Sequence, residues 1–194
     1  MRDCLKVVGG AVFALMLALV FSVRAADTDV LNTNTVVLGE PGTLVILTPK
    51  DWTMSITNVS LKGNPPTVDL YSANRSVGVR LTIYWDGFNG SISKLADPQM
   101  DTIVSNVAVR EYVAISVEKS FVVEKFQGPK VTGAFARFTD AHWTPMMKDD
   151  YKNVATGMFH CGNIWGNFNL VSNDKNGPAF DRGLEVLKSF RRQP

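Results

Sequence analysis

Residues 77–85 read Val-Gly-Val-Arg-Leu-Thr-Ile-Tyr-Trp, and this stretch decides the fold class. Apolar side chains occupy every second position along it: Val77, Val79, Leu81, Ile83 and Trp85. The positions between them include Arg80, Thr82 and Tyr84, which carry polar groups. Because successive side chains of a β-strand point to opposite faces, this alternation predicts a strand with one face in the core.

Further apolar runs on both sides of this stretch predict additional strands. We expect them at residues 43–48, 52–59, 117–126, 131–141, 153–161 and 164–172. A tight turn at Gly162-Asn163 separates the last two. Since short connections join neighbouring strands of an antiparallel sheet, we expect these strands to pair antiparallel.

Two segments with helical spacing complete the predicted domain. The first covers residues 98–112, where Asp97 can cap the helix and Pro98 can begin it. Its apolar stripe consists of Met100, Ile103, Val104 and Val107. The second begins near Pro178 and is amphipathic. Its apolar stripe consists of Phe180, Leu184, Leu187 and Phe190. The predicted fold class is therefore α+β, an antiparallel β-sheet flanked by helices.

Four short segments lie in or between these predicted elements. They read Pro-Lys-Asp-Trp at 49–52, Tyr-Trp at 84–85, Gly-Ala-Phe-Ala-Arg-Phe-Thr-Asp at 133–140 and Leu-Glu-Val-Leu-Lys-Ser-Phe-Arg at 184–191. Together with the order of the elements, they resemble the PsbP-like family of α/β/α sandwiches. The resemblance spans residues 43–192 and implies an exported bacterial member with this architecture.

The resemblance also carries an expectation about function. The PsbP-like fold is shared by extrinsic lumenal proteins of photosystem II, by a Ran-binding nucleotide-release factor and by small exported bacterial proteins. Since the known members mainly bind and stabilise other proteins, the resemblance implies a non-catalytic binding or accessory protein. The four segments are packing motifs, and no residue in them transfers the photosystem metal-retention role or the Ran-binding surface.

The N-terminus has the pattern of a secretory signal. Arg2 and Lys6 precede the uncharged, mostly apolar run 7–23, and Val-Arg-Ala stands at its end. A basic start, a hydrophobic centre and small side chains at the exit are the features that a signal peptidase reads. We expect cleavage after Ala25. The alternative is an uncleaved signal anchor, because the run approaches the roughly 20 apolar residues that span a bilayer.

These features divide the chain into a signal peptide (1–25), an N-terminal extension (26–42) and a single globular domain (43–192). We expect the protein to be exported, either to the periplasm or as a secreted protein, with membrane contact only through an uncleaved signal. Three Asn-x-Ser sequons are present, at Asn58, Asn74 and Asn89. They matter only in a eukaryotic secretory pathway, whereas the compact signal and the lack of disulfides favour a bacterial periplasm.

Charge and cysteine content exclude several kinds of partner and linkage. The chain has 20 Lys and Arg against 18 Asp and Glu, and the two totals become equal once residues 1–25 are removed. A neutral domain lacks the basic face that nucleic acid requires. Beyond the signal segment Cys161 is the only cysteine, so we expect no internal disulfide and interpret its side chain as a buried small hydrophobe.

Geometry disfavours a catalytic dyad of Cys161 with a histidine. His160 is its neighbour in a predicted strand and therefore points to the opposite face. Folding the predicted hairpin antiparallel places His142 beside Val154, which is about 23 Å along the strand from Cys161. The sequence has no zinc-binding spacing, phosphate loop or serine elbow, so we predict no cofactor and disfavour an ordinary hydrolase.

The predicted tip of this hairpin gathers apolar side chains. They are Trp143, Pro145, Met146 and Met147. Exposed aromatic side chains and flexible methionines suit contact with another protein, a lipid surface or an apolar ligand. We predict that these residues bind a protein partner in the cell envelope. The alternative is that the loop folds back over one end of the core.

The same hairpin carries a candidate metal site. Its members are Asp140, His142, Asp149 and Asp150. Carboxylate oxygens and an imidazole nitrogen can together hold a divalent cation. The alternative function is therefore a small-molecule or divalent-metal-binding enzyme with a site near Asp140 and His142. In the simpler interpretation Asp140 ends a strand and the two later aspartates belong to a solvated loop.

Overall fold

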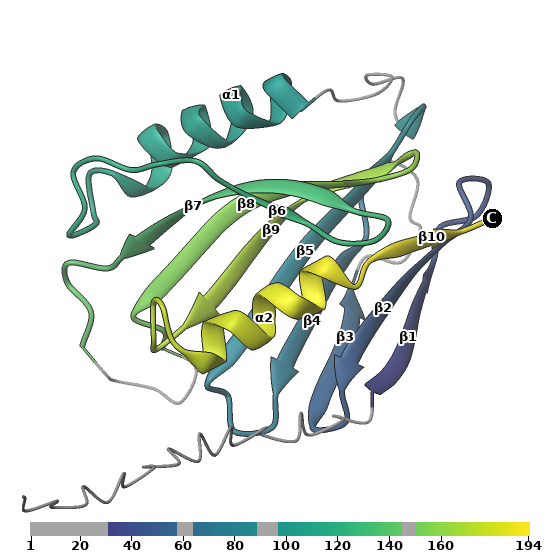
Figure 1. Ribbon diagram of the computed structural model, residues 1–194, viewed down its shortest axis with the longest axis horizontal. Coiled ribbons are helices and arrows are strands. Elements are labelled where there is room, and N and C mark those ends of the chain that lie inside the picture. Colours follow the sequence, from purple (N-terminus) through teal and green to yellow (C-terminus); the bar gives the residue numbers. More distant parts are fainter. Residues whose placement is uncertain (1–30, 58–63, 89–96, 145–149) are drawn as a thin grey trace, which may run out of the picture.

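The computed structural model describes residues 31–57, 64–88, 97–144 and 150–194 (Figure 1). These residues form two antiparallel sheets, with α-helices α1 and α2 and the π-helix η2. The larger sheet has seven strands in the order β3-β4-β5-β9-β8-β7-β6. The smaller sheet has three strands in the order β1-β2-β10. The predicted α+β fold class is confirmed.

The strands of the larger sheet alternate with turns along much of the chain. They are β3 (Trp52–Thr57), β4 (Thr67–Ser72), β5 (Val77–Trp85), β6 (Glu124–Gln127), β7 (Thr132–Thr139), β8 (Asn153–Cys161) and β9 (Ile164–Ser172). The strands of the smaller sheet are β1 (Leu31–Val37), β2 (Thr43–Pro49) and β10 (Arg191–Gln193). The helices are α1 (Asp97–Val107), η2 (Ala108–Tyr112) and α2 (Pro178–Lys188).

The larger sheet lies between two layers (Figure 1). Helix α2 and the smaller sheet cover one face, where α2 contacts β5, β9 and β2. Helix α1 covers the other face over β7 and β8. The main core lies on the α2 side, and a second cluster of buried residues lies under α1.

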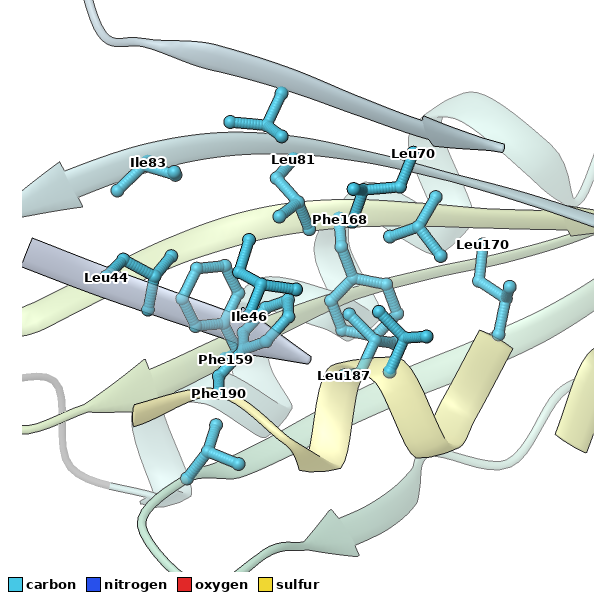
Figure 2. Packing of buried hydrophobic residues seen from close by; sticks show 14 of the residues in the cluster. Leu44, Ile46, Leu70, Leu81, Ile83, Phe159, Phe168, Leu170, Leu187 and Phe190 are labelled. Atoms are coloured by element: carbon cyan, nitrogen blue, oxygen red, sulfur yellow. The ribbon is translucent and has the colours of Figure 1, made fainter. Parts of the chain in front are cut away.

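Strand β5 lies in the middle of the chain's main core and buries the face that its sequence predicts. Its inward aliphatic side chains are all 0% exposed: Val77, Val79, Leu81 and Ile83. Arg80 between them is exposed and forms an ion pair with Asp69 of β4 at 2.6 Å. The inward side chains belong to the same cluster as Phe168 of β9 and Leu187 of α2 (Figure 2).

The two residues after the C-terminal end of helix α2 contact both sheets. Phe190 is 1% exposed, and its ring centroid lies 5.1 Å from that of Phe159 in β8. The Ser189 hydroxyl accepts the backbone N–H of Leu47 at 3.0 Å, and it donates to a carbonyl of its own helix at 2.6 Å. Leu47 is in the middle of β2, so these contacts join segments that are 142 residues apart.

Both predicted helices are confirmed. The helix predicted at 98–112 is α1, which η2 continues to Tyr112. Met100 and Val104 of its predicted stripe are buried in the cluster with β7 and β8. The second helix begins at Pro178 as predicted and buries Phe180. Strands at 43–49, 153–161 and 164–172 also match the predicted ranges closely.

Strands β1, β4 and β10 lie outside the segments predicted as strands. β1 is part of the predicted N-terminal extension, yet all seven of its residues pair with β2. β4 has only Val68 and Leu70 as buried apolar residues, too few for a clear alternating pattern. β10 reads Arg-Arg-Gln and has no apolar residue at all. It forms because its backbone pairs with residues 43–45 of β2.

The strand predicted at 117–126 is wrong for most of its length. Only its last three residues are in a strand, because β6 begins at Glu124. Glu118 gives the physical reason. Its carboxylate accepts the backbone N–H of Thr139 at 2.7 Å and the Thr139 hydroxyl at 2.8 Å. At Glu118 a side chain therefore takes the place of a backbone ladder bond, and an alternating pattern alone cannot reveal such a contact.

The connection between β7 and β8 begins earlier than predicted. Phe138 pairs with Val154 and Thr139 with Asn153, so residues 140–152 join the two strands. The predicted position of His142 beside Val154 is therefore wrong. Phe138 and Val154 pack together in the cluster under α1, and this burial fixes the register.

Replacing Leu187 by alanine is expected to lower the free energy of unfolding by about 3 kcal/mol, because it leaves a cavity between α2 and the sheets. Glu185 on the exposed side of the same helix is the matched control. Glu185→Ala should cost less than about 0.5 kcal/mol. Urea denaturation followed by tryptophan fluorescence measures both values, and equal losses would contradict the packing of α2.

Candidate functional site

The β7–β8 connection begins with a turn that Asp140 holds. Its Oδ1 atom accepts the backbone N–H of His142 at 2.8 Å. Its own backbone N–H donates to the carbonyl of Lys152 at 2.9 Å. An aspartate that bonds the N–H two residues further on is a common turn former. Asp140 therefore has a structural role at the end of β7.

Trp143 follows this turn and is half-buried, whereas His142 beside it is exposed. The Lys152 ammonium lies 5.8 Å from the centroid of the Trp143 ring, a cation–π contact that covers one face of the indole. Among the described residues the buried indole N–H of Trp143 has no hydrogen-bond partner. Tryptophan combines a large apolar body with one polar group and is enriched at interaction surfaces.

Most of the other predicted site residues lie within 145–149, outside the described residues. They are Pro145, Met146, Met147 and Asp149. Asp150 is described and is half-buried. Within the described ranges, no three His, Cys, Asp or Glu side chains come together in an arrangement that could hold a metal ion. The complete metal site and the complete partner-binding tip therefore stay predictions.

A small pocket of about 170 Å³ lies beside the Asp140 turn. Most of its lining is apolar and comes from Tyr112, Ile115, Phe138, Val154 and Val171. Asp140 and Tyr151 add polar atoms to the lining. Sites for drug-sized ligands are typically about 300–1,000 Å³. The pocket is therefore suited to a single apolar side chain of a partner.

Two exposed aliphatic side chains lie beside the same turn. Ile115 is 52% exposed and Val117 is 60% exposed. The Val117 N–H donates to the Thr139 carbonyl at 2.8 Å, and the Ala141 N–H donates to the Ile115 carbonyl at 3.1 Å. Exposed apolar side chains next to an apolar pocket mark interaction sites. We call Ile115, Val117, Trp143 and the pocket the hairpin-end surface.

The sequence patterns do not identify Ile115 and Val117 as site residues. The predicted strand at 117–126 includes Val117 and would bury one of its faces. The signal that could find them is the run Ile-Ser-Val at 115–117, which follows a helix and precedes Glu118 and Lys119. Two aliphatic residues that continue neither a helical nor a strand-length pattern are candidates for surface contact.

Glu118 holds this segment against β7. Its carboxylate accepts two hydrogen bonds from Thr139 and forms an ion pair with Lys175. Burial alone would raise the pKa of Glu118, but the Lys175 ammonium and the Thr139 donors outweigh it and lower the pKa to about 2. At neutral pH the carboxylate is therefore ionised and keeps the hairpin-end surface in place.

Arg137 of β7 forms an ion pair with Glu124 of β6 and hydrogen bonds to the segment before α2. Arg137 donates to Glu124 at 2.7 Å and to the Asn176 side chain at 3.0 Å. Its guanidinium carbon lies 4.1 Å from the centroid of the Phe180 ring. Arg137 therefore has a structural role, because its contacts connect β7 to α2.

Cys161 is 1% exposed and packs in the main core. Burial raises the pKa of its thiol. A nucleophilic cysteine needs a lowered pKa and access to solvent. Cys161 meets neither condition. His160 precedes it in β8 and pairs with Trp165 and Thr132 in the neighbouring strands. The interpretation of Cys161 as a small buried hydrophobe is confirmed.

Comparison with known proteins bears on the fold. The solution structure of cyanobacterial PsbP (CyanoP) from Synechocystis sp. PCC 6803 is similar to this chain, with a TM-score of 0.50 and 12% sequence identity. The similarity covers 90% of this chain and 99% of the cyanobacterial protein. The chain has the PsbP-like fold. No protein-family model and no curated protein matches the sequence.

The PsbP-like fold confirms the resemblance that the four short sequence segments indicate. Coverage of nearly the whole of both chains shows a shared architecture rather than a shared fragment. At 12% identity the similarity fixes the fold and transfers no site residue, so function has to be argued from the surface of this PsbP-like chain. None of the described helices is long and apolar enough to cross a membrane.

Acid is expected to weaken the contact between Glu118 and its partners. The folded-state pKa of about 2 lies below the usual unfolded value, so the contribution to stability is complete above about pH 4.5 and is lost as the pH falls towards 2. Glu118→Gln should lower the free energy of unfolding by about 2 kcal/mol at pH 7, after allowance for solvent screening. The deficit should shrink steadily below pH 4.5.

Urea denaturation of the wild type and Glu118→Gln at several pH values between 7 and 2.5 measures this difference. Glu185→Gln is the matched control, because the Glu185 side chain is 69% exposed. A deficit of Glu118→Gln that stays constant down to the lowest pH would contradict the role given to the carboxylate.

Proposed function

We propose that this chain is an exported, non-catalytic accessory protein that binds a protein partner through the hairpin-end surface. The observation that carries the proposal is the exposure of Ile115 and Val117 beside an apolar pocket. The fold supports it, because the PsbP-like fold is a scaffold on which function lies in surface sites.

The titratable groups at this surface, and the buried Cys161 at the other end of β8, favour binding over catalysis. Asp140 is used in a turn, and Glu118 is held ionised by Lys175 and Thr139. The Cys161 thiol is buried, with a raised pKa. A general base or nucleophile works best when its pKa lies near the operating pH, and neither Glu118 nor Cys161 is shifted in that direction.

The size and lining of the pocket favour a partner that inserts one aliphatic or aromatic side chain. Interfaces gain most of their affinity from a few apolar anchors that fill such pockets, while surrounding contacts exclude water. Ile115 lines the pocket and Val117 follows it two residues later, while Asp140 and Lys152 add polar groups to the lining. This arrangement matches an apolar centre with a polar rim.

Export rests on the N-terminal pattern. Residues 1–25 have the basic start, apolar centre and small-residue exit of a cleaved signal, and they lie outside the described residues. The partner is therefore expected in the cell envelope or outside the cell. A periplasmic location is the more specific form of the proposal.

Photo-crosslinking is expected to capture the partner at this surface. Protein carrying benzoylphenylalanine at Val117, produced in its own exporting cell, should give one dominant adduct on irradiation. Ile115→Asp should reduce that adduct at least about tenfold, because a carboxylate at the pocket must be desolvated when an apolar anchor enters. Trp143→Ala should reduce it as well. Mass spectrometry identifies and quantifies the adduct.

The matched control is Val109→Asp, because Val109 is an equally exposed aliphatic residue on η2. It should leave the adduct unchanged, and circular dichroism should show that every variant is folded. The proposal fails if the Val117 probe gives no adduct in the exporting cell, or if Val109→Asp and Ile115→Asp reduce it equally.

The exported protein is expected to begin at Ala26, because the small side chains at positions 23 and 25 suit cleavage by a signal peptidase. N-terminal sequencing of protein from the periplasmic and culture fractions checks this. A chain that retains residues 1–25 and sediments with membranes would instead support the signal-anchor alternative.

A further inference from the structure

Strand β1 is an edge of the smaller sheet. All seven of its residues pair antiparallel with β2, from Leu31 opposite Pro49 to Val37 opposite Thr43. In the described part of the chain, no strand pairs with its other side. Half of the backbone N–H and carbonyl groups of β1 therefore point away from the sheet and can accept another strand.

This edge lacks the features that normally protect such strands. The sequence of β1 is Leu-Asn-Thr-Asn-Thr-Val-Val, with no charge, no proline and no glycine. The edge strand β6 of the larger sheet, by contrast, is four residues long and carries Glu124 and Lys125 in ion pairs. Short, charged edges resist the addition of a strand, whereas long neutral edges permit it.

The two faces of β1 have different surroundings. Val36 on one face is 2% exposed, and Asn34 on the same face donates to the Thr48 hydroxyl at 2.8 Å. The side chains of the other face are all exposed: Leu31, Thr33, Thr35 and Val37. Leu31 is 50% exposed and Val37 is 68% exposed. The exposed face therefore has an aliphatic side chain at each end and hydroxyl groups between them.

We propose that two copies of this chain associate along this edge, with β1 pairing antiparallel to β1 of the second copy about a twofold axis at Asn34. This register places Leu31 of each copy opposite Val37 of the other, and Thr33 opposite Thr35. The two three-stranded sheets then form one continuous sheet. The proposal is independent of the hairpin-end surface, which uses other residues.

The sequence of β1 is self-complementary only in this register. A slip of one residue would turn the exposed side chains of one copy to the face that is buried in the other. A slip of two residues would set Leu31 or Val37 opposite a threonine and lose the aliphatic pairs. Aliphatic and Thr–Thr pairs across strands are stabilising, and the strand brings no like charges together because it has none.

Sedimentation velocity of the protein purified from its exporting cell tests the association. A single strand pair is a small interface, so we expect a dissociation constant on the order of 10–100 µM. Thr33→Lys/Thr35→Lys sets lysine opposite lysine and should raise the dissociation constant at least about tenfold. The effect should shrink in about 1 M NaCl, because salt screens the repulsion.

A variant with opposite charges tests the register itself. Thr33→Glu/Thr35→Lys sets glutamate opposite lysine only when the axis lies at Asn34, and it should restore the dissociation constant to within about threefold of the wild type. The matched control is Thr53→Lys/Thr57→Lys on the edge strand β3, where both threonines are exposed, and it should dimerise like the wild type.

Three results would overturn the proposal: a wild-type protein that stays monomeric at about 500 µM, a dimer that survives the two lysines on β1, or a Thr33→Glu/Thr35→Lys variant that dimerises as weakly as the dilysine variant. All substituted side chains are exposed in the single chain, and urea midpoints confirm that each variant is folded. The concentration series of the wild type decides the association without any variant.

Discussion

The contact between the end of helix α2 and strand β2 is the constraint on which the other parts of this structure depend. The Ser189 hydroxyl accepts the backbone N–H of Leu47, and Phe190 is buried against Phe159 on the larger sheet. β10 follows directly and adds to β2, while β1 pairs with β2 alone. Helix packing therefore positions β2, and β2 in turn positions the edge that β1 presents.

The other end of α2 is connected to the hairpin-end surface. Asp174 accepts backbone N–H groups of Ala179 and Phe180 in the first turn of the helix, which satisfies donors that would otherwise be unpaired. Lys175, the next residue, forms the ion pair with Glu118 that holds the apolar segment on β7. Lys175 just before α2 and Ser189 just after it thus connect this helix to the hairpin-end surface and to β2.

The parts of the fold that were predictable are those with a sustained hydrophobic period. β5 and α2 each show one clear period over most of their length, because one face of each is in the core. β10 has no apolar residue and depends on backbone pairing with a distant strand, which no local pattern records. At the candidate site the sequence predicts that Asp140 ends a strand and that Trp143 lies in the connection after it. The exposure of Ile115 was not predictable, because its segment is held by tertiary contacts such as the Ala141 N–H to the Ile115 carbonyl, which no local pattern records.

The position of α2 and β10 late in the sequence has a consequence for when the chain can fold. Leu47 bonds Ser189 across 142 residues, and closing so long a loop is entropically costly and slow. A polypeptide that emerges from the ribosome therefore keeps its apolar strands uncovered until nearly all of it has been synthesised. The core can close only once the last helix has been synthesised, and a chain that folds this late is compatible with the export that we propose.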